Sequence, residues 1–432
     1  MGRAHGQACA VRIASTGCRR RGLGGRCMRS LSGRAQEPQA QALDLRVLWL
    51  MGGCAFASMA SMRVCDAMLP ALGAEFGGSS AQLTQTISVF ALAYGLLQLF
   101  YGPLGDRYGK LRLIAYATLG CTLGSVAAAL APDLEWLVAS RALTGMAAAG
   151  VVPLTMAWIG DHVPYATRQQ VLARLLGVTV FGMVCGQWAG GLVSEWLGWR
   201  LAFVFLAVVF LTTGVLLLRV VGRQEAPDQA AGPLGVVGQV REVLSQPWAR
   251  LMLLVAGLEG ALGFGALAFI PWYLHTRFGL SLSQAGALVA LYGGGGLVYS
   301  RCAPRLLASL GEAGLARLGA LCLAFAYLTL SLAASWGWAL PACLIAGFGF
   351  YALHNTLQVH ATQMAPAARG TAVSLFVCAL FLGQSWGIQG SAWLAERHGP
   401  GTVFLAAALG LLLLGMGFAW LATRRAADKR RD

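Results

Sequence analysis

Four charged side chains fall inside long apolar stretches of this 432-residue sequence: Arg63, Asp66, Arg141 and Glu259. An ionised side chain at the centre of a helix in hydrocarbon costs about 2.5–3.5 kcal/mol or more, so each needs a partner or a function. Arg63 and Asp66 are three residues apart and share one helix face, where they can neutralise each other. A carboxylate in such surroundings can take up a proton from one side of an apolar layer and release it to the other.

The positions of these four residues suggest a joint role in proton coupling. Asp66 and Glu259 lie in opposite halves of the chain, as a proton site shared between two moving halves requires. Arg141 would expel the proton by approaching either carboxylate in one state only. Structural alternatives stay open: a static Arg63–Asp66 pair that only orients its helix, a structural Arg141, and a Glu259 exposed near a helix end.

A polar stripe is predicted on one helix near residue 355. Tyr351, His354 and Gln358 follow one another at i, i+3 and i+7, and Asn355 lies beside them. The stripe either lines a cavity or satisfies its own hydrogen bonds in the core. His354 and His360 are not at the i, i+4 spacing of a helical metal site, so we expect no metal and no cofactor. Further candidates for a cavity lining are Gln187, Gln384 and Gln389.

The composition indicates the class of protein. Only 11% of the residues are charged and the mean hydropathy is +0.64, whereas soluble proteins contain roughly 25% charged residues. Apolar runs long enough to cross a bilayer as helices recur along the chain, without the alternation of barrel strands. We therefore predict an all-α membrane protein with twelve transmembrane helices, at 47–69, 84–106, 111–131, 136–158, 171–193, 201–221, 251–273, 284–303, 316–335, 339–360, 370–393 and 402–423.

The basic residues predict the orientation. The net charge is +15, but the predicted external loops hold only Arg200, Arg277 and Arg397, and most of the 32 lysines and arginines fall in the other connections. By the positive-inside rule both termini are cytoplasmic. The positive charge therefore faces a lipid surface and does not indicate nucleic-acid binding. The short loops are typical of a bacterial inner-membrane protein, and we expect a monomer.

The pattern divides the chain into five parts. Residues 1–45 are rich in Arg and Gly and contain no secretory h-region; we expect a disordered basic extension, or a true start at Met28. The other four parts are a six-helix bundle at 46–221, a cytoplasmic linker at 222–250, a second six-helix bundle at 251–423 and a basic tail at 424–432.

An internal repeat relates the two predicted bundles. A shift of 202 residues places Phe76-Gly77 on Phe278-Gly279, Ser79 on Ser281, and Gln82 on Gln284. A shift of 201 places Glu195 on Glu396. Two parallel, pseudo-symmetric halves of this kind are typical of transporters, in which they rock around a midplane site.

The charged turn GPLGDRYGKLR at 102–112 carries a family resemblance. Its pattern of Gly102, Asp106, Arg107, Gly109 and Lys110 resembles the loop between spans 2 and 3 of the major facilitator superfamily. The resemblance implies a latch: Asp106 would face the start of span 11, near Arg369-Gly370, and hold the outward-open state. The structural alternative is a charged turn that only fixes topology.

Three further stretches resemble motifs of the same superfamily. LVASRALTGMAAAG at 137–150 resembles the span-4 motif, and MRVCDAMLP at 62–70 resembles a span-1 element of its drug–proton antiporter branch. GMVCGQWAGG at 182–191 resembles the span-5 antiporter motif, although Gln187 stands where many antiporters carry Pro. The glycines of that stretch would allow close helix packing: Gly182, Gly186, Gly190 and Gly191.

These features together predict a secondary active transporter. By resemblance it would move a small organic molecule by alternating access, as proton-coupled efflux, with a small-molecule substrate, protons and the lipid bilayer as partners. No GxxxxGK[ST] motif for ATP occurs. The alternative within transport is a proton-coupled importer or a facilitator. A membrane-embedded enzyme is disfavoured because no HExxH occurs, and a non-transporting sensor because no large cytoplasmic domain is present; we expect no enzymatic activity.

Overall fold

The computed structural model describes residues 45–221 and 236–428, and every regular element in these ranges is helical. Residues 1–44 of the predicted basic extension, residues 222–235 at the start of the predicted linker and the last four residues lie outside these ranges. Before the gap the helices are α1 Leu45–Arg63, α2 Leu69–Phe76, α3 Ser80–Leu83, α4 Gln85–Tyr108, α5 Lys110–Ala129, α6 Leu134–Ala148, α7 Val151–His162, α8 Tyr165–Trp196 and α9 Trp199–Val221.

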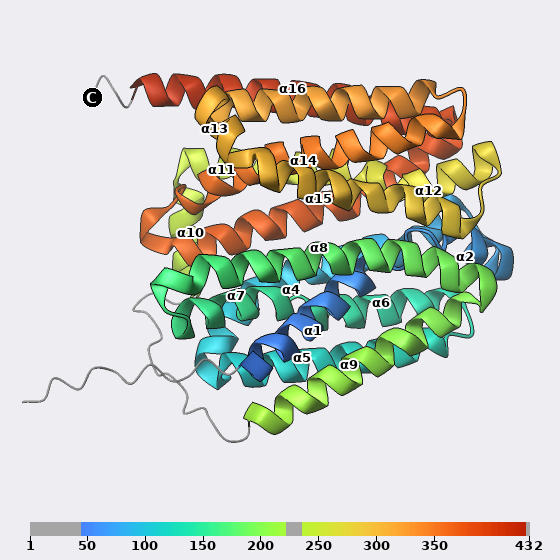
Figure 1. Ribbon diagram of the computed structural model, residues 1–432, viewed down its shortest axis with the longest axis horizontal. Coiled ribbons are helices and arrows are strands. Elements are labelled where there is room, and N and C mark those ends of the chain that lie inside the picture. Colours follow the sequence, from blue (N-terminus) through green and yellow to red (C-terminus); the bar gives the residue numbers. More distant parts are fainter. Residues whose placement is uncertain (1–44, 222–235, 429–432) are drawn as a thin grey trace, which may run out of the picture. The chain divides into compact units, whose positions relative to one another are not determined.

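After the gap, a short helix precedes the apolar elements (Figure 1). This helix, α10, lies in the predicted linker, for which no helix was predicted. The helices are α10 Val236–Ser245, α11 Pro247–Glu259, α12 Gly265–Phe278, α13 Leu282–Leu332, α14 Ala339–Thr362, α15 Arg369–His398 and α16 Pro400–Asp428, with a π-helical turn at Gly260–Phe264 and 3-10 turns at Trp336–Trp338 and Pro366–Ala368.

Eleven helical segments within the described residues are long and apolar enough to cross a membrane. The predicted spans at 284–303 and 316–335 belong to one 51-residue element, α13. Its backbone leaves the helical conformation at Gly311, where φ is 65°, a value that glycine adopts without strain. The count of twelve spans, which treats the two sides of Gly311 separately, stays a prediction.

The predicted first span is interrupted in the structure. We expected one helix over 47–69, but α1 ends at Arg63, residues 64–68 form turns, and α2 begins at Leu69. Pro70 explains the break, because it has no N–H to donate to the carbonyl of Asp66 and its ring would clash there. Asp66 therefore lies in an irregular segment between two helices, not on a continuous helix face.

Close packing of α8 on α1 depends on glycines. A Cβ atom at Gly182, Gly186 or Gly190 would collide with a backbone oxygen of the segment running from α1 into the turn after it. Those oxygens belong to Phe56, Ala60 and Val64. Gly191 faces a different element, since its Cβ would meet the backbone oxygen of Leu282 at the start of α13. The spacing of four residues places the first three glycines on one face of α8.

Among the described residues, two large buried apolar clusters form most of the core, and a small third one contains Tyr299, Leu315 and Ala352. One large cluster is drawn entirely from residues 243–422. The other large cluster is drawn mainly from residues 57–210, with three residues from the later helices. The helices before the gap, α1–α9, form a first set, and those after it, α10–α16, form a second set. The two sets meet where α4 packs on α15 and α8 packs on α13 (Figure 1).

The stretches that the 202-residue shift aligns have the same local structure. Ser79 with Gln82 and Ser281 with Gln284 both form capping boxes at helix N-termini. Each of these N-termini also donates a backbone N–H to a glutamate at the end of a helix in the other set. Ala81 N lies 3.1 Å from Glu396 Oε1, and Ser283 N lies 2.9 Å from Glu195 Oε2. We call this pair of contacts the end clasps.

Candidate functional site

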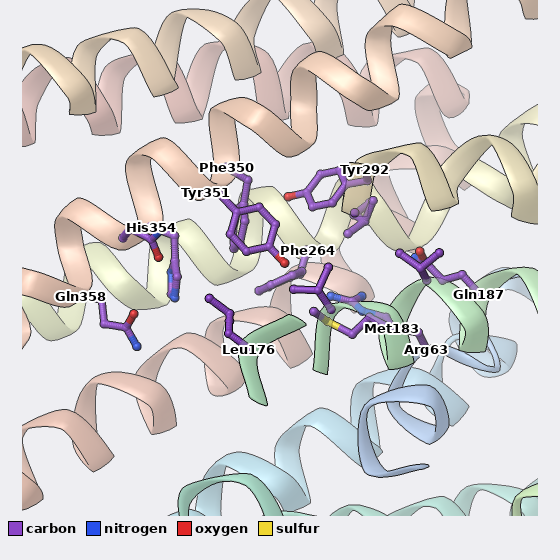
Figure 2. Close-up of a pocket in the computed structure, with 15 residues that line it drawn as sticks. Arg63, Leu176, Met183, Gln187, Phe264, Tyr292, Phe350, Tyr351, His354 and Gln358 are labelled. Carbon is purple, nitrogen blue, oxygen red and sulfur yellow. The ribbon is translucent and has the colours of Figure 1, made fainter. Parts of the chain in front are cut away.

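A cavity lies between α1, α8, α13, α14 and the π-helical turn (Figure 2). Its volume is about 200 Å³, and apolar and aromatic side chains make up most of its wall. Arg63 is the one formally charged residue that lines it. The polar residues of the wall are Gln187, Tyr292, Tyr351, His354, Asn355 and Gln358. The whole predicted stripe of residues 351–358 thus faces this cavity.

The first carboxylate, Asp66, lies directly behind Arg63 and is fully buried. Its Oδ2 atom lies 3.4 Å from Arg63 Nη1 and accepts a hydrogen bond of 3.1 Å from Gln187 Nε2. Its Oδ1 atom has no hydrogen-bond partner among the described residues. The structure therefore joins Arg63 and Asp66 as a pair, and adds Gln187 from α8 to it.

The second carboxylate, Glu259, is also fully buried, so the alternative of an exposed position is wrong. Its Oε2 atom lies 3.1 Å from His354 Nδ1, and its Oε1 atom has no partner among the described residues. Glu259 is the last residue of α11, and the π-helical turn follows it immediately. Such turns often mark functional sites, because one added residue reorients the neighbouring side chains.

Arg141 occupies a different place from the one we expected. It is fully buried but does not line the cavity. Its guanidinium donates to the backbone oxygen of Thr86 and to both oxygens of Ser61, at 2.8–3.2 Å, and lies over the ring of Phe90. In this structure it contacts neither carboxylate, and it anchors α6 to α1 and to the start of α4.

The turn at 102–112 holds an ion-pair network of its own. Lys110 Nζ lies 2.9 Å from Asp106 Oδ1 and 2.8 Å from Asp161 Oδ2, at the end of α7. Gly109, with φ of 90°, makes the reversal between α4 and α5. Within the described ranges no ion pair joins Asp106 to Arg369, which is exposed at the start of α15.

Several cavity residues escaped the sequence analysis. Phe350 immediately precedes the polar stripe, and Phe264 follows Glu259 closely in sequence, but aromatic residues are too common in membrane helices to single these out. No pattern in the sequence marks Tyr292 as a cavity residue. Of the glutamine candidates, Gln187 lines the cavity, while Gln389 bonds Ser88 Oγ at 2.7 Å and joins α15 to α4.

One stretch matches the letters of a hydrolase motif. GQSWG at 383–387 has the G-x-S-x-G spacing of a nucleophile elbow. That elbow needs a strand, a sharp turn and a helix, whereas residues 383–387 lie inside the continuous helix α15. The match therefore carries no hydrolase chemistry.

The described helices and the cavity between two sets of them define a multi-pass, all-helical membrane protein. The family model of the Major Facilitator Superfamily matches residues 51–388, and the chain belongs to this family of transporters.

Curated proteins of similar sequence are also transporters. The chain is 24% identical over 361 residues to an uncharacterized MFS-type transporter, YceJ of Bacillus subtilis, covering 81% of this chain and 90% of that protein. It is 29% identical over 195 residues to the multidrug efflux pump LfrA of Mycolicibacterium smegmatis, covering 45% of this chain and 39% of the pump.

Among solved structures, a bacterial homolog of the human lysosomal transporter Spinster superposes with a TM-score of 0.70 at 20% identity, covering 88% of this chain and 97% of that one. At that identity the likeness concerns the fold alone.

Proposed function

We propose that this transporter exports a small organic molecule in exchange for protons. The observation that carries the proposal is the pair of buried carboxylates beside one cavity. Asp66 belongs to the first set of helices and Glu259 to the second, and each has one oxygen without a hydrogen-bond partner within the described ranges. A buried carboxylate is better tolerated when protonated, so each can hold a proton while the cavity is closed.

His354 supplies the route between the cavity and Glu259 in this proposal. It lines the cavity and contacts Glu259 at 3.1 Å, so a proton that enters the cavity reaches the carboxylate through the imidazole. Arg63 and Gln187 connect Asp66 to the cavity without relaying a proton, since both line the cavity and contact Asp66 Oδ2. Proton binding at either site then alters contacts that line the cavity.

The proposal includes the expected architecture. The bundles 46–221 and 251–423 would alternate around the cavity, with twelve spans and both termini on the cytoplasmic side of a bacterial cell membrane. The Lys110 network would bias one state. Export is favoured over import by the efflux pumps among the relatives.

Proton flux in inside-out membrane vesicles tests this function. Vesicles that are acid inside and contain a pH-quenched dye would be given a panel of drugs and metabolites. We expect at least one compound to restore fluorescence with the wild type, and neither Glu259→Gln nor Asp66→Asn to respond. Glu242→Gln on α10, a partly exposed glutamate that does not line the cavity, is the matched control and should behave like the wild type. Substrate uptake by whole cells without any proton response would contradict export by exchange.

A further inference from the structure

The cavity wall has unused hydrogen-bond donors. Arg63 carries five N–H donors, yet among the described residues it donates one hydrogen bond, to Asp66 at 3.4 Å. The hydroxyl of Tyr292 is buried, the residue is 6% exposed, and the hydroxyl has no hydrogen-bond partner in the part of the chain that the structure describes. Tyr292 and Tyr351 line the same cavity as Arg63 (Figure 2). A ligand with a hydrogen-bond acceptor would satisfy them.

The charges around the cavity argue against an ionised ligand. Arg63 is balanced by Asp66 behind it, and Glu259 by His354 when the imidazole is protonated. With both carboxylates ionised, the wall therefore carries a total charge of zero or minus one, which disfavours an anion in a low-dielectric site. An ammonium group is also disfavoured, because Arg63 stands at the wall while both carboxylates are buried behind other side chains.

The rest of the wall favours an aromatic body of limited size. Phe264 and Phe350 lie with ring centroids 4.8 Å apart, and the ring of His354 stacks on Phe350 at 5.1 Å. The volume of about 200 Å³ is below the roughly 300–1,000 Å³ of pockets that enclose drug-sized ligands. We infer that the cavity binds an uncharged, single-ring aromatic compound whose polar end is a hydrogen-bond acceptor, held by Arg63 and Tyr292. This inference rests on the proposed function in taking the cavity as the substrate site.

Three probes with one ring and different heads test the inference. N,N-dimethylbenzamide is a neutral acceptor, benzoate is an anion and benzylamine is a cation. Binding to the purified full-length protein in detergent would be measured from the concentration dependence of the thermal unfolding midpoint. We expect the amide to bind several-fold more tightly than either charged probe. Preference for benzoate or benzylamine, or no midpoint shift with the amide, would overturn the inference.

Removal of the Tyr292 hydroxyl oxygen provides a second test, with a matched control. Tyr292→Phe should weaken amide binding roughly 3- to 10-fold, the loss of one neutral hydrogen bond. The unliganded variant should be at least as stable as the wild type, because the removed hydroxyl has no partner to lose. Tyr116→Phe makes the same change on the exposed surface of α5 and should leave binding unchanged. Wild-type affinity in Tyr292→Phe would exclude the assigned contact.

The outcome separates this inference from the proposed function. Amide binding without any proton flux in the vesicles would support the ligand class and contradict exchange with protons. Proton flux driven only by charged compounds, with no amide binding, would support the exchange and overturn the ligand class.

Discussion

At the scale of single residues, Arg141 differs most from its expected role. Its three hydrogen bonds end on oxygens of Ser61 and Thr86, so the residue joins three helices. Removing it would take one donor away from each of these buried oxygens, and a buried group that is left unsatisfied costs about 1–3 kcal/mol.

We therefore predict that Arg141→Gln lowers the thermal unfolding midpoint of the purified protein markedly. Arg200→Gln, at a partly exposed arginine, should lower it less. A transport-dead Arg141→Gln with wild-type stability would instead support the expected role in expelling the proton.

Glu75 gives a prediction of pH dependence outside the membrane-spanning helices. Its carboxylate accepts a hydrogen bond from Trp199 Nε1 at 2.7 Å and pairs with Arg200. These contacts hold the pKa of Glu75 below its ordinary value of 4.5, with the Trp199 hydrogen bond as the largest cause.

A lowered pKa means that the stabilisation is present in full above the ordinary pKa and disappears as the pH falls through the lowered one. The unfolding midpoints of wild type and Glu75→Gln should therefore differ at pH 7 and converge in acid, as the pH falls below the lowered pKa. A difference that persists in acid would contradict the ionised contact.

The sequence identified most of the charged site but not its pairings. A charge in an apolar run is visible without a structure, so Arg63, Asp66 and Glu259 were found, and the three-residue spacing predicted the Arg63–Asp66 contact. The Glu259–His354 pair joins residues 95 positions apart. Glu259 also directly precedes a π-helical turn that no pattern in the sequence indicates.

At the scale of elements, periodic apolar runs predicted the helices, and the breaks within them were missed. Pro70 interrupts the first span because it has no N–H to donate to the carbonyl of Asp66, whereas the predicted span ran over 47–69 without a break. The helix α10 lay in a stretch interpreted as linker. The small residues of 182–191 were informative, since they indicated a close approach without naming α1 as the neighbour.

The α1–α8 contact predicts a sharp difference between two glycines of α8. Gly186→Ala would drive a Cβ into the backbone of Ala60, whereas nothing lies within 4 Å of a Cβ at Gly177. We expect Gly186→Ala to lower folded yield and the unfolding midpoint, because backbone cannot move aside as a side chain can.

Gly177→Ala should leave stability unchanged or raise it slightly, as alanine favours the helix by about 1 kcal/mol. Gel-filtration yield and thermal unfolding of both variants give the comparison. Equal behaviour of the two would contradict the packing described here.

At the scale of the whole described chain, the end clasps tie the two sets of helices together. Each is a carboxylate at the N-terminus of a helix, where the N–H groups and the helix dipole favour a negative charge. The end clasps lie near the N-terminal end of α4, and the Lys110 network lies at its C-terminal end, about 24 helical residues further along the chain. The repeat made the resemblance between halves visible, but only the structure shows that Glu195 and Glu396 reach across.

Loss of both clasps should open this end of the molecule. Spin labels placed at Ser80 and Arg397 would report a longer or broader distance in the double variant Glu195→Ala, Glu396→Ala, which removes both acceptors. Each single variant, which keeps one clasp, should show a smaller change. Wild-type distances in the double variant would show that other contacts hold the end closed.

The central claim is that a buried carboxylate couples protons to the movement of substrate. The most direct test uses reconstituted vesicles and the compound that gives the largest proton response with the wild type. Glu259→Gln should still exchange labelled for unlabelled compound across the membrane, because the cavity wall is intact. It should not accumulate the compound when a proton gradient is imposed. Gradient-driven accumulation at the wild-type rate in Glu259→Gln would contradict the claim.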